Sequence, residues 1–122
     1  MSAAADELAT VLAARHLDSA RRHVFICVGG GKCAPVQASE ASWDYLKKRL
    51  RERGLVDVEC GVLRTRTGCL RICREGPVAI VYPEGIWYRD CSPANLERII
   101  EQHLIGGTPV ADLVLATGPL DP

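Results

Sequence analysis

Six cysteines in a chain of 122 residues are the feature that most restricts what this sequence can form. Four of them fall into two pairs that lie far apart in the sequence, Cys27 with Cys33 and Cys69 with Cys73. In a reducing compartment, cysteines grouped in this way are more typical of metal ligation or redox chemistry than of structural disulfides. The apolar content of 48% is enough to build a core without disulfides. The four cysteines are therefore candidate ligands.

Charge and hydropathy argue against several other classes of protein. Fifteen basic and fifteen acidic residues balance, so the net charge gives no reason to expect binding to nucleic acid or to an anionic membrane. No apolar run approaches the roughly 20 residues of a membrane-spanning helix. Asp6 and Glu7 stand where a secretion signal would carry basic and apolar segments. We expect a cytoplasmic protein with no nucleic-acid or membrane partner.

The first half of the chain predicts two helices and two strands. Residues 6–22 have apolar residues at helical spacing and predict an extension outside the main domain. Residues 23–28 form a short apolar run that stops at three glycines, which predicts a buried strand. A helix is predicted to begin at Ser39 and to end at Gly54. The valine-rich residues 55–63 predict the second strand.

The second half predicts a hairpin followed by a helix. Residues 77–82 and 86–90 are two strand-like runs on either side of a Pro-Glu-Gly turn. Ser92 and Pro93 suit the N-cap and first position of a helix that ends at two glycines, 106–107. The tail beyond Pro109 is expected to fray. The Gly76–Pro77 peptide bond is expected to be trans, because cis prolyl bonds are rare.

This order of elements predicts an α/β fold. One crossover helix between the first two strands makes them parallel, and the hairpin adds antiparallel strands. The outline is that of a thioredoxin-like fold with a four-stranded mixed sheet, flanking helices and an N-terminal helical extension. We expect the extension to cover residues 1–22, the domain residues 23–108 and a C-terminal tail residues 109–122.

The predicted fold brings the two cysteine pairs together. Parallel strands deliver their C-terminal ends to the same edge of a sheet, so the loops after the first two strands become neighbours. A 2Fe-2S cluster takes four thiolates, two for each iron, and two separated pairs suit that shape. The sequence therefore predicts a 2Fe-2S cluster held by Cys27, Cys33, Cys69 and Cys73.

The residues around these cysteines suit a cluster. Glycines at 29–31 and 68 leave backbone N–H groups that could be directed at cluster sulfurs. Four basic residues place positive charge near a centre that is net negative, and we expect them to raise the reduction potential. They are Lys32, Arg66, Arg71 and Arg74.

The chain resembles a known family in several segments at once. They are residues 23–27 (HVFIC), 67–73 (TGCLRIC), 76–77 (GP), 81–83 (VYP), 85–88 (GIWY) and 101–107 (EQHLIGG) with Pro109. Together they resemble the thioredoxin-like 2Fe-2S ferredoxins, a bacterial family that includes the Shethna-type iron–sulfur protein. The resemblance implies a one-electron carrier with the four ligands named above, a cluster near the surface and a homodimer.

One departure from that family concerns the first loop. Only five residues separate Cys27 from Cys33, whereas the family usually has a longer loop there. A shorter loop is expected to reduce the cover over the cluster. Cys60 is a possible substitute ligand, but it falls inside the predicted second strand. Cys60 and Cys91 are otherwise expected to be buried, as small apolar residues.

Three other functions remain open at the level of sequence. The chain could be a cluster-bearing subunit of a larger redox complex, a structural four-cysteine zinc protein, or a dithiol oxidoreductase. The five-residue spacer fits a zinc knuckle poorly, and a Cys-x-x-Cys motif is missing from the sequence. No pairing of nucleophile and base suggests an enzyme. Redox proteins are the expected partners.

Overall fold

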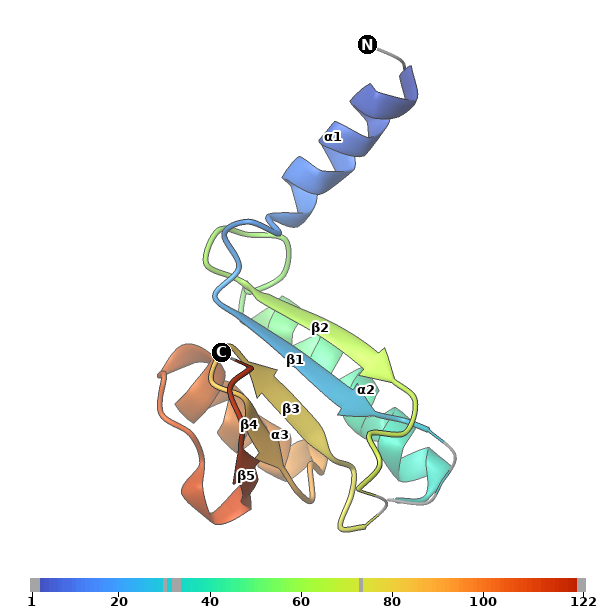
Figure 1. Ribbon diagram of the computed structural model, residues 1–122, viewed down its shortest axis with the longest axis vertical. Helices are drawn as coiled ribbons and strands as arrows, with labels where there is room; N and C mark the ends of the chain where they lie inside the picture. Colours follow the sequence, from blue (N-terminus) through green and yellow to red (C-terminus); the bar gives the residue numbers. More distant parts are fainter. Residues whose placement is uncertain (1–2, 30, 32–33, 73, 121–122) are drawn as a thin grey trace.

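The computed structural model describes residues 3–29, 31, 34–72 and 74–120 and shows an α/β protein (Figure 1). The elements in chain order are α1 (Ala3–Arg15), β1 (Arg22–Cys27), α2 (Val36–Glu52), β2 (Val62–Thr67), β3 (Ala79–Tyr82), β4 (Ile86–Tyr88), α3 (Pro93–Ile99), a π-helical segment (Ile100–Ile105), a 3-10 turn (Ala111–Leu113) and β5 (Val114–Thr117).

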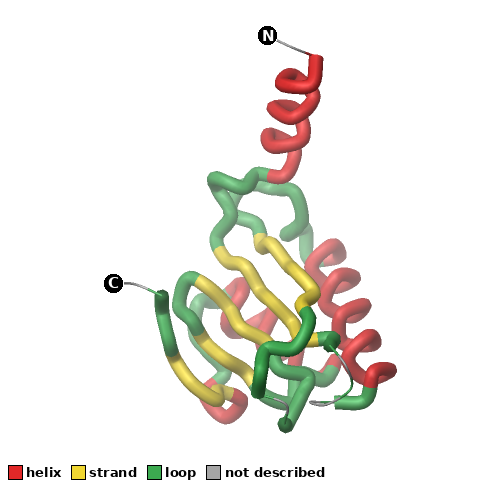
Figure 2. The backbone as a smooth tube through the Cα atoms, turned by 45° about the vertical axis from the view of Figure 1, so that its right-hand side comes forward, coloured by secondary structure: helices red, strands yellow, loops and turns green. Residues whose placement is uncertain are grey.

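The five strands form one mixed sheet in the order β2-β1-β3-β4-β5. Strands β1 and β2 run parallel, as predicted from the crossover helix α2, while β1–β3, β3–β4 and β4–β5 are antiparallel. Helices α2 and α3 cover the same face of the sheet (Figures 1 and 2). The side chains buried between the sheet and these helices include Val24, Ile26, Leu46, Val81 and Leu96.

The C-terminal tail and the second predicted strand differ from the structure. The tail does not fray throughout, because β5 pairs with β4 and makes the sheet five-stranded where four strands were expected. The second strand begins at Val62 instead of residue 55. Asp57 and Cys60 have positive φ angles of 57° and 58°, which are incompatible with an extended strand.

The predicted start of one helix is confirmed, and that of another is wrong. Ser92 caps α3 as predicted, with its side chain accepting a hydrogen bond from the Asn95 backbone N–H at 3.3 Å. Helix α2 instead begins at Val36, after Pro35, and Ser39 lies buried inside it. The Gly76–Pro77 bond is cis, contrary to the expectation of trans.

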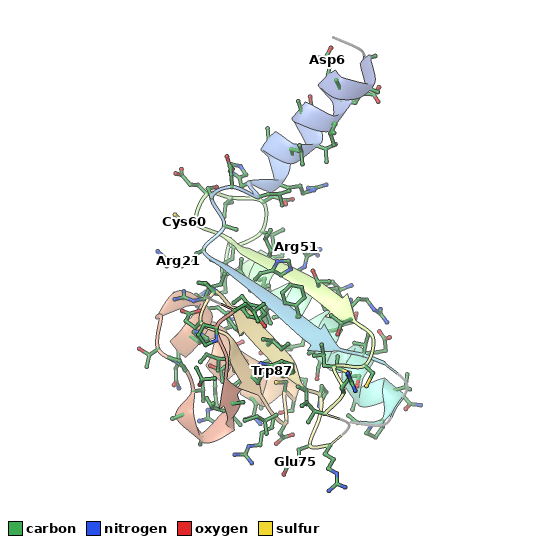
Figure 3. All side chains as sticks on the ribbon, viewed as in Figure 1. Asp6, Arg21, Arg51, Cys60, Glu75 and Trp87 are labelled. Carbon is green, nitrogen blue, oxygen red and sulfur yellow. The ribbon has the colours of Figure 1, made fainter. Side chains whose placement is uncertain are left out.

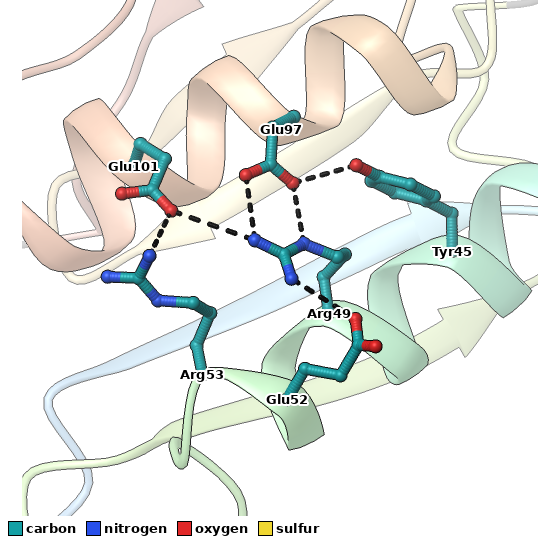
Figure 4. Close-up of polar contacts among 6 residues, drawn as sticks. All are labelled: Tyr45, Arg49, Glu52, Arg53, Glu97 and Glu101. Carbon is teal, nitrogen blue, oxygen red and sulfur yellow. Dashed lines mark hydrogen bonds and ion pairs between the residues drawn. The ribbon is translucent and has the colours of Figure 1, made fainter.

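An ion-pair network joins the two helices on the covered face of the sheet (Figure 4). Glu97 of α3 accepts hydrogen bonds from Arg49 Nε at 2.8 Å and from the Tyr45 hydroxyl at 2.7 Å, and both partners lie on α2. The bonds from Arg49 and Tyr45 lower the pKa of the Glu97 carboxyl to about 2. The charged form of Glu97 is therefore the one that holds α2 against α3.

The polar side chains of Tyr88 and His103 are fully buried and hydrogen-bonded to each other. The Tyr88 hydroxyl lies 2.7 Å from His103 Nδ1 and accepts a hydrogen bond from the Val110 backbone N–H at 3.1 Å. Burial lowers the pKa of His103. The Tyr88 side chain thus connects β4 with the π-helical segment and with the chain that leads to β5.

Helix α1 stands away from the rest of the molecule (Figures 1 and 2). Within Ala3–Arg15 no residue is buried, and Leu8, Val11 and Leu12 are about half exposed, at 58%, 52% and 46%. An ion pair between Arg15 Nη1 and Asp57 Oδ2, at 2.7 Å, ties the end of α1 to the loop before β2. Across the described part of the chain, every helix is too short or too polar to span a bilayer.

Candidate metal centre

The first two strands end side by side. They are parallel, with Cys27 of β1 in register with Thr67 of β2, and both strands end at that pair. The Val28 backbone N–H then donates to the Thr67 carbonyl at 3.0 Å, which carries the pairing one residue further. The loops that follow β1 and β2 therefore start from adjacent points on one edge of the sheet.

Backbone contact keeps the two loops together beyond the strands. A methyl carbon placed on Gly29 would lie 2.5 Å from the Cys69 backbone nitrogen and 2.7 Å from the Gly68 carbonyl carbon. No real side chain fits in so small a space, so a residue without a Cβ is required there. The glycine after β1 thus lets the first loop lie directly against the second.

The two described cysteines of the predicted ligand set differ in their surroundings. Cys27 is 2% exposed, and its backbone N–H donates to the Val78 carbonyl of the segment before β3 at 2.9 Å. Cys69 is exposed, and its Sγ accepts a hydrogen bond from the Arg71 backbone N–H at 3.1 Å. Backbone N–H donors to sulfur stabilise a thiolate and influence the potential of a cluster bound to it.

Arg71 makes this N–H···S contact through an unusual backbone conformation. Its φ angle is 72°, in the left-handed region that non-glycine residues seldom adopt. In that conformation the Arg71 N–H points back at the Cys69 sulfur. The sequence did not reveal this donor, because nothing in the identity of an arginine signals a positive φ.

The remaining two predicted ligands, Cys33 and Cys73, lie outside the described residues. The structure therefore places one cysteine from each pair, Cys27 and Cys69, on converging segments. Among the described residues, no group of three or more His, Cys, Asp or Glu side chains is arranged to hold a metal ion. The four-cysteine set stays a prediction.

Cys60 lies at the wrong end of the molecule to replace a ligand. It precedes β2, while Cys69 follows it, and a six-residue strand is about 20 Å long. Figure 3 shows Cys60 beside the base of α1, at the end of the sheet opposite Glu75. Cys60 is exposed, so the expectation of a buried apolar residue was wrong for it, because the chain turns there instead of forming a strand.

Cys91 is buried, as predicted. It is 0% exposed and packs in the main core with residues of β4 and α3. Burial raises the pKa of its thiol well above the usual range. A thiol in this environment stays protonated and packs as a small apolar side chain.

The basic residues predicted near the cysteines do not form one group. Lys32 lies outside the described residues, and Arg66 forms an ion pair with Glu40 of α2. Arg71 and Arg74 are exposed, and the structure records no acidic partner for either among the residues it describes. Among the four predicted basic residues, these two arginines are therefore the ones whose positive charge can act on a nearby cluster.

The chain is similar in sequence to known 2Fe-2S ferredoxins. No family model matches the chain. A curated 2Fe-2S ferredoxin from Aquifex aeolicus is 36% identical over 104 residues, which cover 80% of this chain and 91% of the relative. A 2Fe-2S ferredoxin from Clostridium pasteurianum is 32% identical over 96 residues, 76% of this chain and 94% of the relative.

A solved structure matches the fold as well as the sequence. The crystal structure of the wild-type thioredoxin-like [2Fe-2S] ferredoxin from Aquifex aeolicus aligns with a TM-score of 0.70 and 31% identity, and the alignment covers 80% of this chain and 98% of that one. The mixed sheet, with Cys27 at the end of β1 and Cys69 in the loop after β2, thus defines a thioredoxin-like domain with cysteines at one edge of the sheet. The chain belongs to the thioredoxin-like 2Fe-2S ferredoxins.

Proposed function

We propose that this protein is a one-electron carrier that holds a single 2Fe-2S cluster on Cys27, Cys33, Cys69 and Cys73. The observation that carries the proposal is the backbone contact between Gly29 and Cys69, because it puts one described cysteine of each pair on loops that touch. Such a cluster accepts and releases one electron when it is bound. Membership of the ferredoxin family supports the same function.

The described residues give the two cysteines different tasks in this proposal. Buried Cys27 fixes the inner side of the site, since its backbone is hydrogen-bonded to the segment before β3. Cys69 is exposed in the loop after β2, where the Arg71 N–H stabilises its thiolate. We therefore expect electrons to be exchanged with a partner that binds against the loop after β2.

Iron and acid-labile sulfide analysis of anaerobically purified protein is the direct test. We expect two irons and two sulfides per chain, a red-brown colour and a paramagnetic signal on one-electron reduction. Colourless protein with bound zinc would contradict the proposal, and so would disulfide reductase activity in cluster-free protein. Either result would favour one of the other functions considered from the sequence.

A matched pair of cysteine variants tests the position of the site. Cys69→Ser should lower the cluster content or change the absorption and paramagnetic spectra, because oxygen would replace sulfur at one ligand. Cys60→Ser removes another exposed cysteine, at the other end of β2, and should leave iron content and spectra unchanged. Equal spectra for Cys69→Ser and the unsubstituted protein would refute the ligand set.

We further propose that the protein acts in the cytoplasm, as a homodimer that passes electrons to other redox proteins. The use of grouped cysteines as thiolates suits a reducing compartment. Sedimentation analysis of the purified holoprotein tests the dimer, and cell fractionation tests the location. Co-purification under reducing conditions should recover the redox partners.

A further inference from the structure

The loop between β2 and β3 carries an exposed apolar side chain between two exposed arginines. Ile72 is 41% exposed, and Arg71 and Arg74, which flank it in the sequence, are exposed as well. Covering an exposed isoleucine with another protein is favourable, and arginine is enriched in protein–protein interfaces. The same loop carries Cys69, so a partner that covers Ile72 is brought next to the proposed cluster.

The charges of this loop favour a partner with an acidic surface. Glu75, an acidic residue of the loop, is already paired with Arg89, with 3.7 Å between Arg89 Nη1 and Glu75 Oε2. For Arg71 and Arg74, no acidic partner is recorded within the described part of the chain. The net charge of the whole chain is zero, so attraction of a partner depends on local charge of this kind.

Backbone hydrogen bonds hold the loop in a defined shape. The Asp90 N–H donates to the Glu75 carbonyl at 2.6 Å, and the Cys91 N–H donates to the Pro77 carbonyl at 2.9 Å. Both bonds join the loop to the segment between β4 and α3. At the other end of the loop, the N–H···S contact described above fixes the chain next to Cys69. A surface that is ordered before binding loses little conformational entropy when a partner covers it.

We propose that the loop after β2 is a docking surface for an acidic face of the redox partner, with Arg71 and Arg74 as its charged contacts. This inference rests on the one-electron carrier proposed above and specifies the chemistry of its partner. Arginine pairs with carboxylates through two parallel hydrogen bonds, which gives the complex a defined orientation as well as attraction. One electron passes between carrier and partner, and no bond forms or breaks.

A different role for the two arginines is to balance the negative charge of the cluster and nothing more. Loss of that role would shift the reduction potential, and it would change the rates of oxidation by all oxidants in the same direction. Loss of a docking role would instead change the rates in opposite directions for an anionic and a cationic oxidant. The two roles can therefore be separated by experiment.

Stopped-flow oxidation of the reduced holoprotein tests the sign of the charge at the docking surface. The probes are ferricyanide, an anion, and hexaammineruthenium(III), a cation, and each takes up one electron. The rate with ferricyanide should fall as the salt concentration rises, and the rate with hexaammineruthenium(III) should increase. The opposite salt dependence would overturn the proposal, since the surface presented to a partner would then be acidic.

Substitution of the arginines tests whether these side chains carry the effect. Arg71→Gln and Arg74→Gln should each slow oxidation by ferricyanide about two- to fivefold at low salt and accelerate oxidation by hexaammineruthenium(III). Arg71→Lys keeps the charge and should keep most of the rate. Arg51→Gln makes the same change of charge at the other end of the sheet and should leave both rates unchanged (Figure 3). Equal changes in one direction with both oxidants would overturn the proposal.

Binding to an acidic polymer gives a measurement that does not depend on electron transfer. The holoprotein should be retained on immobilised poly-L-glutamate at low salt. Arg71→Gln/Arg74→Gln should elute at a lower salt concentration than Arg21→Gln/Arg51→Gln, which has the same net charge but is altered at the opposite end of the sheet (Figure 3). Iron-loaded protein with equal elution of the two double variants would overturn the docking surface alone. Protein without iron would overturn the proposed function itself.

Discussion

Gly29 and Cys69 are in such close backbone contact that the space between them cannot hold a methyl group. The Cβ of an alanine at position 29 would lie 2.5 Å from the Cys69 nitrogen, with backbone atoms on both sides of the clash. Neither segment can relieve it by rotating a side chain. The two cysteine loops can therefore lie this close together only because residue 29 has no Cβ atom.

Gly29→Ala should loosen the site. Moving one loop away from the other is expected to destabilise the fold by about 1–3 kcal/mol, as in other overpacked sites, and to lower the iron content per chain. Gly68→Ala is the matched control, since a Cβ at Gly68 meets nothing within 4 Å. Iron analysis and thermal unfolding of both variants check the prediction. Equal iron content in the two would contradict it.

Arg71→Gln and Arg74→Gln should each lower the reduction potential. Each removes an exposed positive charge from the loop of Cys69, and a unit charge at about 10 Å in water changes the potential by on the order of 10–20 mV. Arg51→Gln makes the same change of charge in the last turn of α2, at the end of the sheet far from Glu75 and the loop of Cys69 (Figure 3), and should have no effect. Potentiometric titration measures all three. A shift in the Arg51 variant as large as in the others would refute local control.

Glu97→Gln should make the fold less sensitive to acid. The pKa of Glu97 is lowered from 4.5 to about 2 by its bonds from Arg49 and Tyr45. Its charged form therefore stabilises the protein fully above pH 4.5, and this contribution is lost as the pH falls toward 2. The variant should unfold a few degrees lower at pH 7, and the difference should shrink below pH 4.5.

The control for this experiment is Glu59→Gln, which removes an exposed carboxylate with no ion pair recorded among the described residues. Its unfolding temperature should follow that of the unsubstituted protein at every pH. A constant difference between Glu97→Gln and the unsubstituted protein from pH 7 to pH 3 would show that the charge of Glu97 is not what joins the helices.

Tyr88→Phe should be strongly destabilising. It removes the hydroxyl that serves both His103 Nδ1 and the Val110 N–H, in a region closed to water. Leaving buried polar groups unpaired costs about 1–3 kcal/mol. Tyr45→Phe removes a hydroxyl from a half-buried site, where water can replace it, and should cost less. Chemical denaturation of both variants gives the comparison. A larger loss for Tyr45→Phe would contradict it.

The sequence predicted those parts of the fold that depend on local chemistry or on strand direction. Ser92 and Pro93 start α3, and the crossover helix makes β1 and β2 parallel. Strand direction alone was then enough to bring Cys27 and Cys69 to one edge of the sheet. Cys33 and Cys73 were predicted on the same grounds, but they lie outside the described residues.

Features that depend on distant contacts or on backbone conformation were missed. Residues 114–117 form a strand because β4 offers an open edge, and their own sequence of four residues carries no such signal. The positive φ of Cys60 keeps residues 55–61 out of β2, and that of Arg71 creates a donor to sulfur. Neither residue type favours this conformation by itself.

Helix α1 and the cysteine loops lie at opposite ends of β1. The whole length of β1 separates α1 from the loop that follows Cys27. Helix α1 is therefore the part of the chain that can change in length or sequence without moving the residues that hold the cysteine loops together.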